Sequence, residues 1–305
     1  MNIQNMISRN TSFYGIRALV LALFIWSCST DTAKEEKQSL DSNAVSAMAE
    51  AAQAADNLMA GLPKFSEIPN LIAQTGAEFE SKLLNPASTA EKVSGNSSKA
   101  AFNIGMYGAD VAYMAVYDKT QEALHTFLAS KKLADKVGVI QAFDQVLVDR
   151  LEKNLSNRDS LLFIAETSLN HSSRLLKSNQ QQKEAALMAA GGFIEGLYLN
   201  CGMIHDYPPT GLPQQEQNKI LVPLVKSVIK QESSLQNLIE LLEKVNNGDE
   251  VISGLITDLK KAQEIFAKAN WPQKIADNKG DLIPTEKDIH ELAVAVSGIR
   301  NGMTR

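Results

Sequence analysis

Residues able to take part in acid–base chemistry lie on two glycine-bearing segments of helical pattern. On the first segment, five side chains recur every three or four residues and therefore share one helix face: Asn103, Tyr107, Asp110, Met114 and Tyr117. A carboxylate in so apolar a stretch is desolvated without compensation unless a hydroxyl or a cation meets it. The pattern permits a ligand pocket lined by Tyr107, Asp110 and Tyr117. It also permits a polar network that only fixes the register of packed helices, which is the more ordinary arrangement.

The second segment, residues 187–204, carries four glycines and a single glutamate in an apolar run. Each interior glycine costs about 1 kcal/mol relative to alanine, so the segment needs a close helix crossing or a ligand against its backbone. Gly192 and Gly196 have the four-residue spacing that lets two helices approach each other. We interpret the segment as the central buried helix of a bundle, with Glu195 bonded to Tyr198 or to a lysine of a neighbouring helix.

A pocket between the two segments would take side chains from both. Its lining would be Tyr107, Asp110, Tyr117, Glu195 and Tyr198. Such a pocket would make the protein a small-molecule receptor, and we keep this as the alternative function.

Cys201 and His205 lie four residues apart and share a helix face, which is half of a metal site. The other histidines, His125, His171 and His290, are scattered along the sequence. A buried thiol and a histidine at a helix end account for the pair more simply. We therefore expect no metal site and keep Cys201 with His205 as a weak candidate.

No complete motif of a common enzyme class occurs in the sequence, since Ser227 and Lys230 match the Ser-x-x-Lys spacing of penicillin-interacting enzymes without its companion motifs. The sequence contains no Gly-x-Ser-x-Gly, no His-Glu-x-x-His, no phosphate-binding glycine-rich loop and no dinucleotide fingerprint. A net charge of −5 over 305 residues argues against a nucleic-acid binder, and two cysteines exclude a disulfide scaffold. The sequence thus names no catalytic residue and no cofactor, and it favours a non-enzymatic protein.

The amino terminus has the pattern of an export signal. Residues 1–27 contain two arginines and no acid, and residues 18–26 form one apolar run, which is too short for a membrane span of about 20 residues. The tetrapeptide Ile25-Trp26-Ser27-Cys28 resembles a bacterial lipobox, although Trp26 is bulkier than usual at its place. The resemblance implies that residues 1–27 are a signal peptide and that Cys28 is acylated.

Residues 28–42 are polar and predict a disordered, flexible tether. Within them, Lys34-Glu35-Glu36 resembles the short signal that displays Bacteroidota lipoproteins on the outer face. Without residues 1–27 the chain has 28 basic and 35 acidic residues, a net charge of −7. Acyl chains, rather than an electrostatic patch, would then hold the protein at a membrane.

Residues 43–305 predict a single all-α domain, an irregular bundle of roughly eight to ten helices with a possible sub-boundary near 207–213. Helices are expected over 43–59, 69–84, 99–117, 118–136, 141–155, 157–176, 180–206, from Pro213 onward with Pro223 as a kink or a boundary, over 250–270, and over a last helix from Thr285 to Arg300. Leu235, Leu238, Leu242 and Val245 give one packed seam, and Asn246-Asn247-Gly248 followed by Asp249 is a stop and a new cap.

The lipobox, the Lys-Glu-Glu tether and the helical body together resemble uncharacterised all-helical lipoproteins of Bacteroidota. The resemblance implies an envelope lipoprotein held in the outer membrane by acyl chains on Cys28, facing either the cell surface or the periplasm. The function expected is a non-enzymatic binding or structural role, with another envelope protein as a candidate partner and no nucleic acid.

Overall fold

The computed structural model describes residues 42–153, 157–205, 213–271, 273, 276 and 287–305. Residues Asn43–Arg305 belong to one compact unit. The predicted signal peptide, residues 28–41 of the predicted tether with Cys28, residues 207–212 of the predicted sub-boundary, and Thr285 lie outside the described residues, whereas Ser42, the last residue of the predicted tether, begins helix α1 (Ser42–Ala60).

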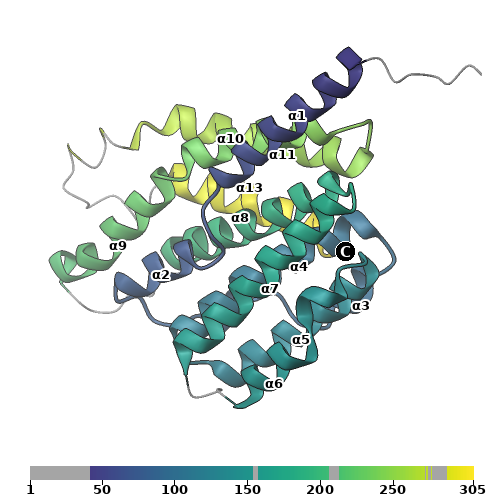
Figure 1. Cartoon of the computed structure of the whole chain (residues 1–305). Coiled ribbons are helices and arrows are strands. Elements are labelled where there is room, and N and C mark those ends of the chain that lie inside the picture. Colours follow the sequence, from purple (N-terminus) through teal and green to yellow (C-terminus); the bar gives the residue numbers. More distant parts are fainter. Residues whose placement is uncertain (1–41, 154–156, 206–212, 272, 274–275, 277–286) are drawn as a thin grey trace, which may run out of the picture. The chain divides into compact units, whose positions relative to one another are not determined.

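The described elements are helices throughout (Figure 1). In chain order they are α1 (Ser42–Ala60), α2 (Glu67–Gln74), the 3-10 helix η1 (Ser81–Leu83), α3 (Thr89–Val93), α4 (Ser97–Val116), α5 (Thr120–Lys136), the 3-10 helix η2 (Ile140–Phe143), α6 (Gln145–Lys153), α7 (Arg158–Ser178), α8 (Gln182–His205), α9 (Gln214–Ile229), α10 (Glu232–Val245), α11 (Glu250–Ala269) and α13 (Lys287–Met303). No strand occurs in the described part of the chain, which confirms the all-α prediction.

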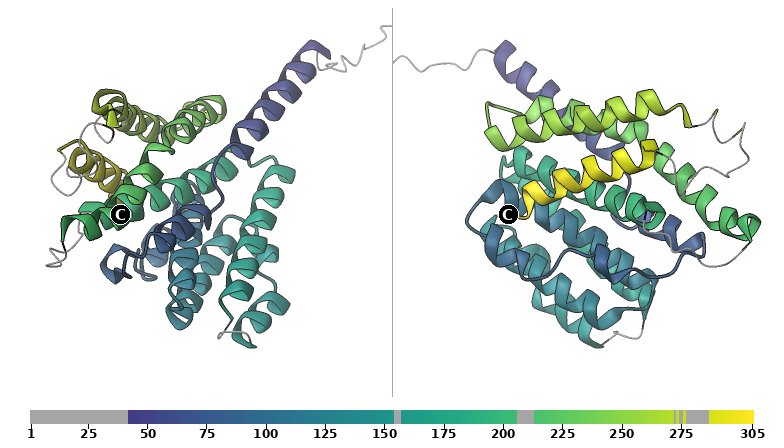
Figure 2. Two further views of the ribbon diagram at one scale, coloured as in Figure 1. Left: turned by 90° about the vertical axis from the view of Figure 1, so that its left-hand side faces the viewer. Right: turned by 180° about the vertical axis from the view of Figure 1, so that it is seen from behind.

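Two groups of helices meet along the pair α4–α8 (Figure 2). Helices α5 and α7 pack on α4, whereas α9, α10 and α13 pack on α8, and α11 covers α13. Every residue of α4 from Ala100 to Val116 is buried. Of the helices described, α8 alone has the length and hydropathy of a membrane span, and 89% of that window is buried inside the molecule. The central buried helix predicted from residues 187–204 is therefore α8.

Two glycines let α4 and α8 touch backbone to backbone. A Cβ atom at Gly105 would lie 1.8 Å from the carbonyl oxygen of Met188, and one at Gly191 would lie 1.9 Å from that of Phe102. The predicted close crossing is confirmed, but it uses Gly191. Gly192 instead faces Phe65, whose ring would lie 2.2 Å from an added Cβ.

Several helix ends follow the predicted signals. Asp249 accepts hydrogen bonds from the backbone N–H groups of Val251 and Ile252 and so caps α11. Gly248 before it has a positive φ of 84°, a conformation that glycine adopts without strain. Pro213 stands at the N-cap of α9, and that helix continues through Pro223 to Ile229.

The prediction of one helix over 69–84 is wrong. The helix α2 ends at Gln74, because Gly76 takes a φ of +81° and the Thr75 hydroxyl bonds back to the carbonyl of Ile72. Residues 77–80 then form neither helix nor strand, and the ring of Phe79 stacks on Tyr113. This segment covers one side of α4.

A single helix over 141–155 would place Phe143, Val146, Leu147, Leu151 and Leu155 on one apolar face. That prediction is wrong at Val146, which is 66% exposed. The segment is not one helix, since η2 ends at Phe143 and Asp144 is extended before α6 starts. That break changes the phase of the pattern, so Val148 faces the core in place of Val146. Between the helices expected over 69–84 and 99–117, where no helix was expected, lies the short helix α3.

Candidate functional site

Two carboxyl groups and one guanidinium meet in the core between α4, α8 and α13. Asp110 and Glu195 are both 0% exposed, and Arg300 is 8% exposed. The Arg300 Nε donates to Glu195 Oε2 at 2.7 Å, and one terminal nitrogen donates to Oε1 at 2.9 Å. That same nitrogen donates to the backbone oxygen of Leu83 at 3.1 Å. Arg300 thus makes a bidentate ion pair, the strongest form of this contact.

Asp110 is the second carboxyl of the cluster, and its surroundings favour its protonated form. Its Oδ2 accepts from the backbone N–H of Asn85 at 3.1 Å, whereas Oδ1 meets no donor among the described residues. Burial and the neighbouring charge of Glu195 both raise the pKa of Asp110 well above its usual range, against the pull of Arg300. A protonated Asp110 can donate its hydroxyl to Glu195.

Glu195 is the charged member of the carboxyl pair. Burial raises its pKa, and the contacts with Arg300 and Asp110 counteract that effect. With Asp110 protonated, the cluster contains one carboxylate, one neutral carboxyl and one guanidinium, and its charges cancel. A buried charge is tolerated when it is paired and hydrogen-bonded in this way.

The tyrosines of α4 fasten the segment between α2 and α3 onto that helix. The Tyr107 hydroxyl donates to the backbone oxygen of Pro86 at 2.9 Å. The Tyr117 hydroxyl donates to that of Ala77 at 2.6 Å, and burial raises the pKa of Tyr117 to about 12. Both hydroxyls therefore serve as donors to the backbone and bring that segment, including Asn85, over Asp110.

The five residues predicted to line one pocket lie in three different places. Asp110 and Glu195 come together in the closed cluster, and Tyr107 and Tyr117 bind the covering segment. Tyr198 lies on the other side of Arg300, whose guanidinium carbon is 4.3 Å from the centre of the Tyr198 ring. A ligand would reach Asp110 or Glu195 only after the helices separated, because both are fully buried.

Tyr198 does line a cavity, a groove of about 410 Å³ between α8 and α13. Its walls are Leu83, Tyr198, Gly202, His205, His290, Ala293, Val294, Ser297, Gly298 and Asn301. The imidazoles of His205 and His290 meet there, with their Nδ1 atoms 3.3 Å apart. Val294 is 59% exposed beside them.

Cys201 and His205 do not converge, although they lie four residues apart. Cys201 is 0% exposed, and burial raises the pKa of its thiol to about 12. His205, by contrast, is exposed and contacts His290. No three His, Cys, Asp or Glu side chains group as metal ligands within the described part of the chain.

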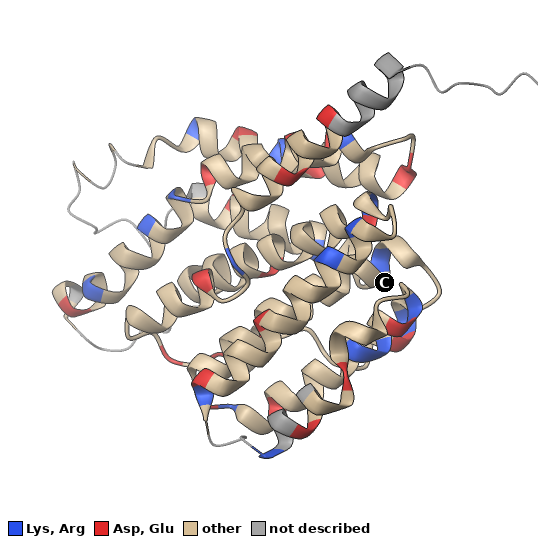
Figure 3. Cartoon of the chain, in the orientation of Figure 1, with Lys and Arg blue, Asp and Glu red and all other residues tan. Residues whose placement is uncertain are grey.

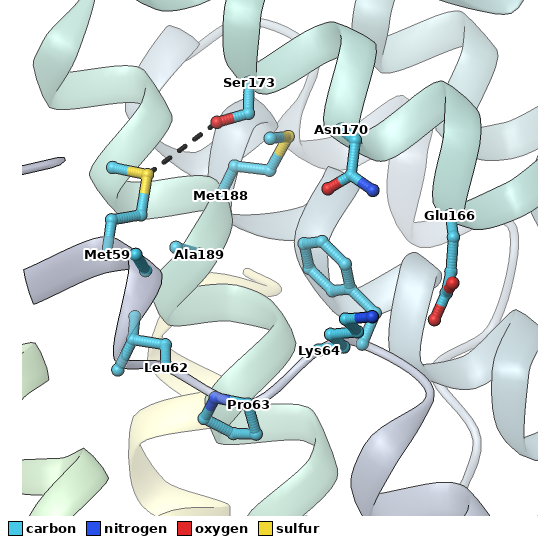
Figure 4. Close-up of a pocket in the computed structure, with 11 residues that line it drawn as sticks. Met59, Leu62, Pro63, Lys64, Glu166, Asn170, Ser173, Met188 and Ala189 are labelled. Atoms are coloured by element: carbon cyan, nitrogen blue, oxygen red, sulfur yellow. Dashed lines mark hydrogen bonds between the residues drawn. The ribbon is translucent and has the colours of Figure 1, made fainter. Parts of the chain in front are cut away.

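A second cavity, of about 220 Å³, lies where the end of α1 and the following residues meet α7 and α8 (Figure 4). Met59 and Met188 approach it from two sides, and the Ser173 hydroxyl contacts the Met59 sulfur at 3.7 Å. Its one carboxylate, Glu166, accepts a hydrogen bond from Ser66. This cavity is small and is bordered by side chains that the sequence analysis did not single out.

Arg300 and His290 are the site residues that the sequence analysis missed. Arg300 lies 105 positions after Glu195 and 190 after Asp110, so no spacing rule connects them. One local signal exists, since Arg300 follows the apolar residues Val296 and Ile299 on the same helix, and both are buried. An arginine on an apolar helix face predicts a buried acidic partner.

Comparisons with protein families, with curated proteins and with solved structures found no match to this chain.

Proposed function

We propose that the protein is a lipid-anchored protein of the cell envelope with a non-enzymatic binding or structural role. Perturbed titratable groups in an accessible cleft are typical of catalytic sites. The observation that carries this proposal is that the most perturbed carboxyls, Asp110 and Glu195, are fully buried and charge-balanced by Arg300. Their arrangement supports a structural role, because it joins α4, α8 and α13 without presenting a reactive group to solvent.

The proposed anchor is a set of acyl chains on Cys28. The sequence around that residue supports it, since a basic segment and an apolar run precede the cysteine and a polar segment follows. Positive and negative residues are interspersed along the helices in the view of Figure 3, which agrees with an anchor of acyl chains rather than of charge. We place the protein at the outer membrane, and Lys34-Glu35-Glu36 favours its outer face over the periplasmic one.

Replacement of Cys28 tests this proposal directly. We expect Cys28→Ala to lose metabolic labelling by a radioactive fatty acid and to leave the membrane fraction of the producing bacterium. Cys201→Ala is the matched control, because it removes the other cysteine and should retain both properties. Protease treatment of intact cells reports the orientation. A Cys28→Ala variant that is labelled and sediments like the wild type would refute the anchor.

The second candidate is a small-molecule receptor, and the groove beside Tyr198 favours it. The groove lies beside the Asp110–Glu195–Arg300 cluster and not within it. Of the five lining residues predicted from the sequence, a ligand in the groove would contact Tyr198 only. Native mass spectrometry of the membrane-purified protein separates the two functions. Gly298→Leu fills the groove. A small molecule that stays bound to the wild type but is absent from this variant supports the receptor. A small molecule that stays bound to both argues against this groove as its site.

A further inference from the structure

The imidazoles of His205 and His290 are held together by the packing of two antiparallel helices. His205 ends α8 and His290 lies in the first turn of α13. Ten residues away on each helix, Glu195 and Arg300 form the buried bidentate pair. That pair fixes the register of α8 against α13, and the register in turn sets the two histidines opposite each other.

The distance between the two Nδ1 atoms suits a shared metal ion. Zinc–imidazole bonds of about 2.0–2.1 Å in a tetrahedral site place two ligand nitrogens about 3.3–3.4 Å apart. The observed separation of His205 Nδ1 and His290 Nδ1 is 3.3 Å, and the ring centres are 4.8 Å apart. The same separation is long for a hydrogen bond, for which about 2.7–3.2 Å is usual.

We propose that His205 and His290 bind a divalent transition-metal ion of the Zn²⁺, Ni²⁺ or Cu²⁺ class across the ends of α8 and α13. This site goes beyond the proposed function and does not depend on it. Imidazole nitrogen suits these ions, whereas Mg²⁺ and Ca²⁺ prefer oxygen ligands. Both histidines are exposed, so an ion reaches them without a change of fold.

The groove beside the histidines accounts for the rest of the coordination shell. Two imidazoles fill two positions of a tetrahedral ion, and no third His, Cys, Asp or Glu joins them within the described residues. The remaining positions face the groove that contains Tyr198, Ser297 and Asn301, where water or an exchangeable donor ligand completes the shell. The site is therefore a two-protein-ligand site of moderate affinity, not a closed structural zinc site.

Metal titration of the full-length, detergent-solubilised protein tests the proposal. Zn²⁺ is added in competition with a chromophoric chelator, Mg²⁺ serves as the negative ion, and Co²⁺ reports tetrahedral geometry through its visible absorption. We compare the wild type with His205→Ala, His290→Ala and the double variant. His125→Ala is the matched control, because His125 is an exposed helical histidine of α5. Circular dichroism verifies that each variant is folded, which is expected because all three side chains are exposed.

We expect each single variant of the pair to weaken Zn²⁺ binding at least about tenfold, since even the loss of a supporting contact to a metal ligand costs about 10–100-fold. The double variant should bind Zn²⁺ more weakly still, but by less than the sum of the two single losses, because both histidines serve the same ion. His125→Ala should bind like the wild type. Equal Zn²⁺ affinity in all variants, or no binding by the wild type, would overturn the proposal.

Discussion

Substitution of alanine for Gly105 tests the crossing of α4 and α8 with the smallest possible change. The new Cβ would lie 1.8 Å from the carbonyl oxygen of Met188, and real Cβ atoms are essentially never closer than 3.0 Å to a neighbour. The two backbones must therefore separate by at least 1.2 Å there, the difference between these distances. No rotamer change relieves the clash, because the atom that is hit belongs to the main chain.

The expected cost follows from this separation. A gap of about 0.5–1 Å already forfeits a quarter to a half of the van der Waals attraction across an interface. Overpacking of a core costs about 1–3 kcal/mol, and a backbone clash belongs at the upper end of that range. Alanine returns about 1 kcal/mol through its helix propensity. We expect Gly105→Ala to lower the free energy of unfolding by about 2 kcal/mol.

Urea unfolding followed by circular dichroism measures this loss. Gly254→Ala is the matched control, since an added Cβ at Gly254 of α11 meets nothing within 4 Å and alanine there should stabilise the protein by about 0.5–1 kcal/mol. Gly191→Ala strikes the same crossing at the Phe102 carbonyl, so the double variant should cost less than the sum of the single ones. A Gly105→Ala protein as stable as Gly254→Ala would refute the close crossing.

Two further predictions concern the buried cluster. Arg300→Met leaves a buried carboxyl pair without its cation. We expect the free energy of unfolding, measured in urea at neutral pH, to fall by about 3–5 kcal/mol. This loss becomes smaller at acidic pH, because Glu195 then takes up a proton. Arg158→Met removes an exposed ion pair and should change the free energy of unfolding little. A loss as large as that of Arg300→Met would contradict the role of burial in this prediction. The pKa of Asp110 is about 3.8 in the unfolded chain and is raised in the folded protein. Between these two pKa values the folded protein holds a proton that the unfolded chain has released, so the free energy of unfolding falls as the pH rises. Asp110→Asn keeps a hydrogen-bond donor for Glu195 but has no carboxyl group to titrate. The free energy of unfolding of this variant should therefore fall less over the same pH range. A pH dependence equal to that of the wild type would show that Asp110 is not the group that holds the proton.

Sequence signals predicted the parts of the fold that depend on neighbouring residues. Asp249 caps α11 and Gly248 takes the left-handed conformation because both effects are local to a few residues. The burial of α8 was predictable from its continuous apolar run. In contrast, Val146 was misplaced because the extended residue Asp144 before α6 resets the helical phase. Aspartate is a common residue at helix starts, and the expectation of one helix over 141–155 passed over that signal.

The site itself was only partly predictable from the sequence. Asp110 and Glu195 stood out as lone acids among apolar residues, and a cation was expected to meet such a group. The partner expected for Glu195 was Tyr198 or a lysine, and the structure supplies Arg300 from α13. Which distant helix brings that cation depends on how the whole bundle packs, and spacing along the chain does not encode it.

The place of Arg300 on α13 also makes the docking of that helix a condition for a charge-balanced core. Loop closure costs more entropy as the loop grows, and pairing Arg300 with Glu195 closes a loop of 105 residues. Asp110 lies on α4 and Glu195 on α8, so both carboxyls lack their cation whenever α13 is not docked. Until α13 docks, both carboxyls must hold protons or remain hydrated, and α8 stays only partly covered. The docking of α13 is thus the step at which the charge of the core is neutralised and the bundle becomes closed to water.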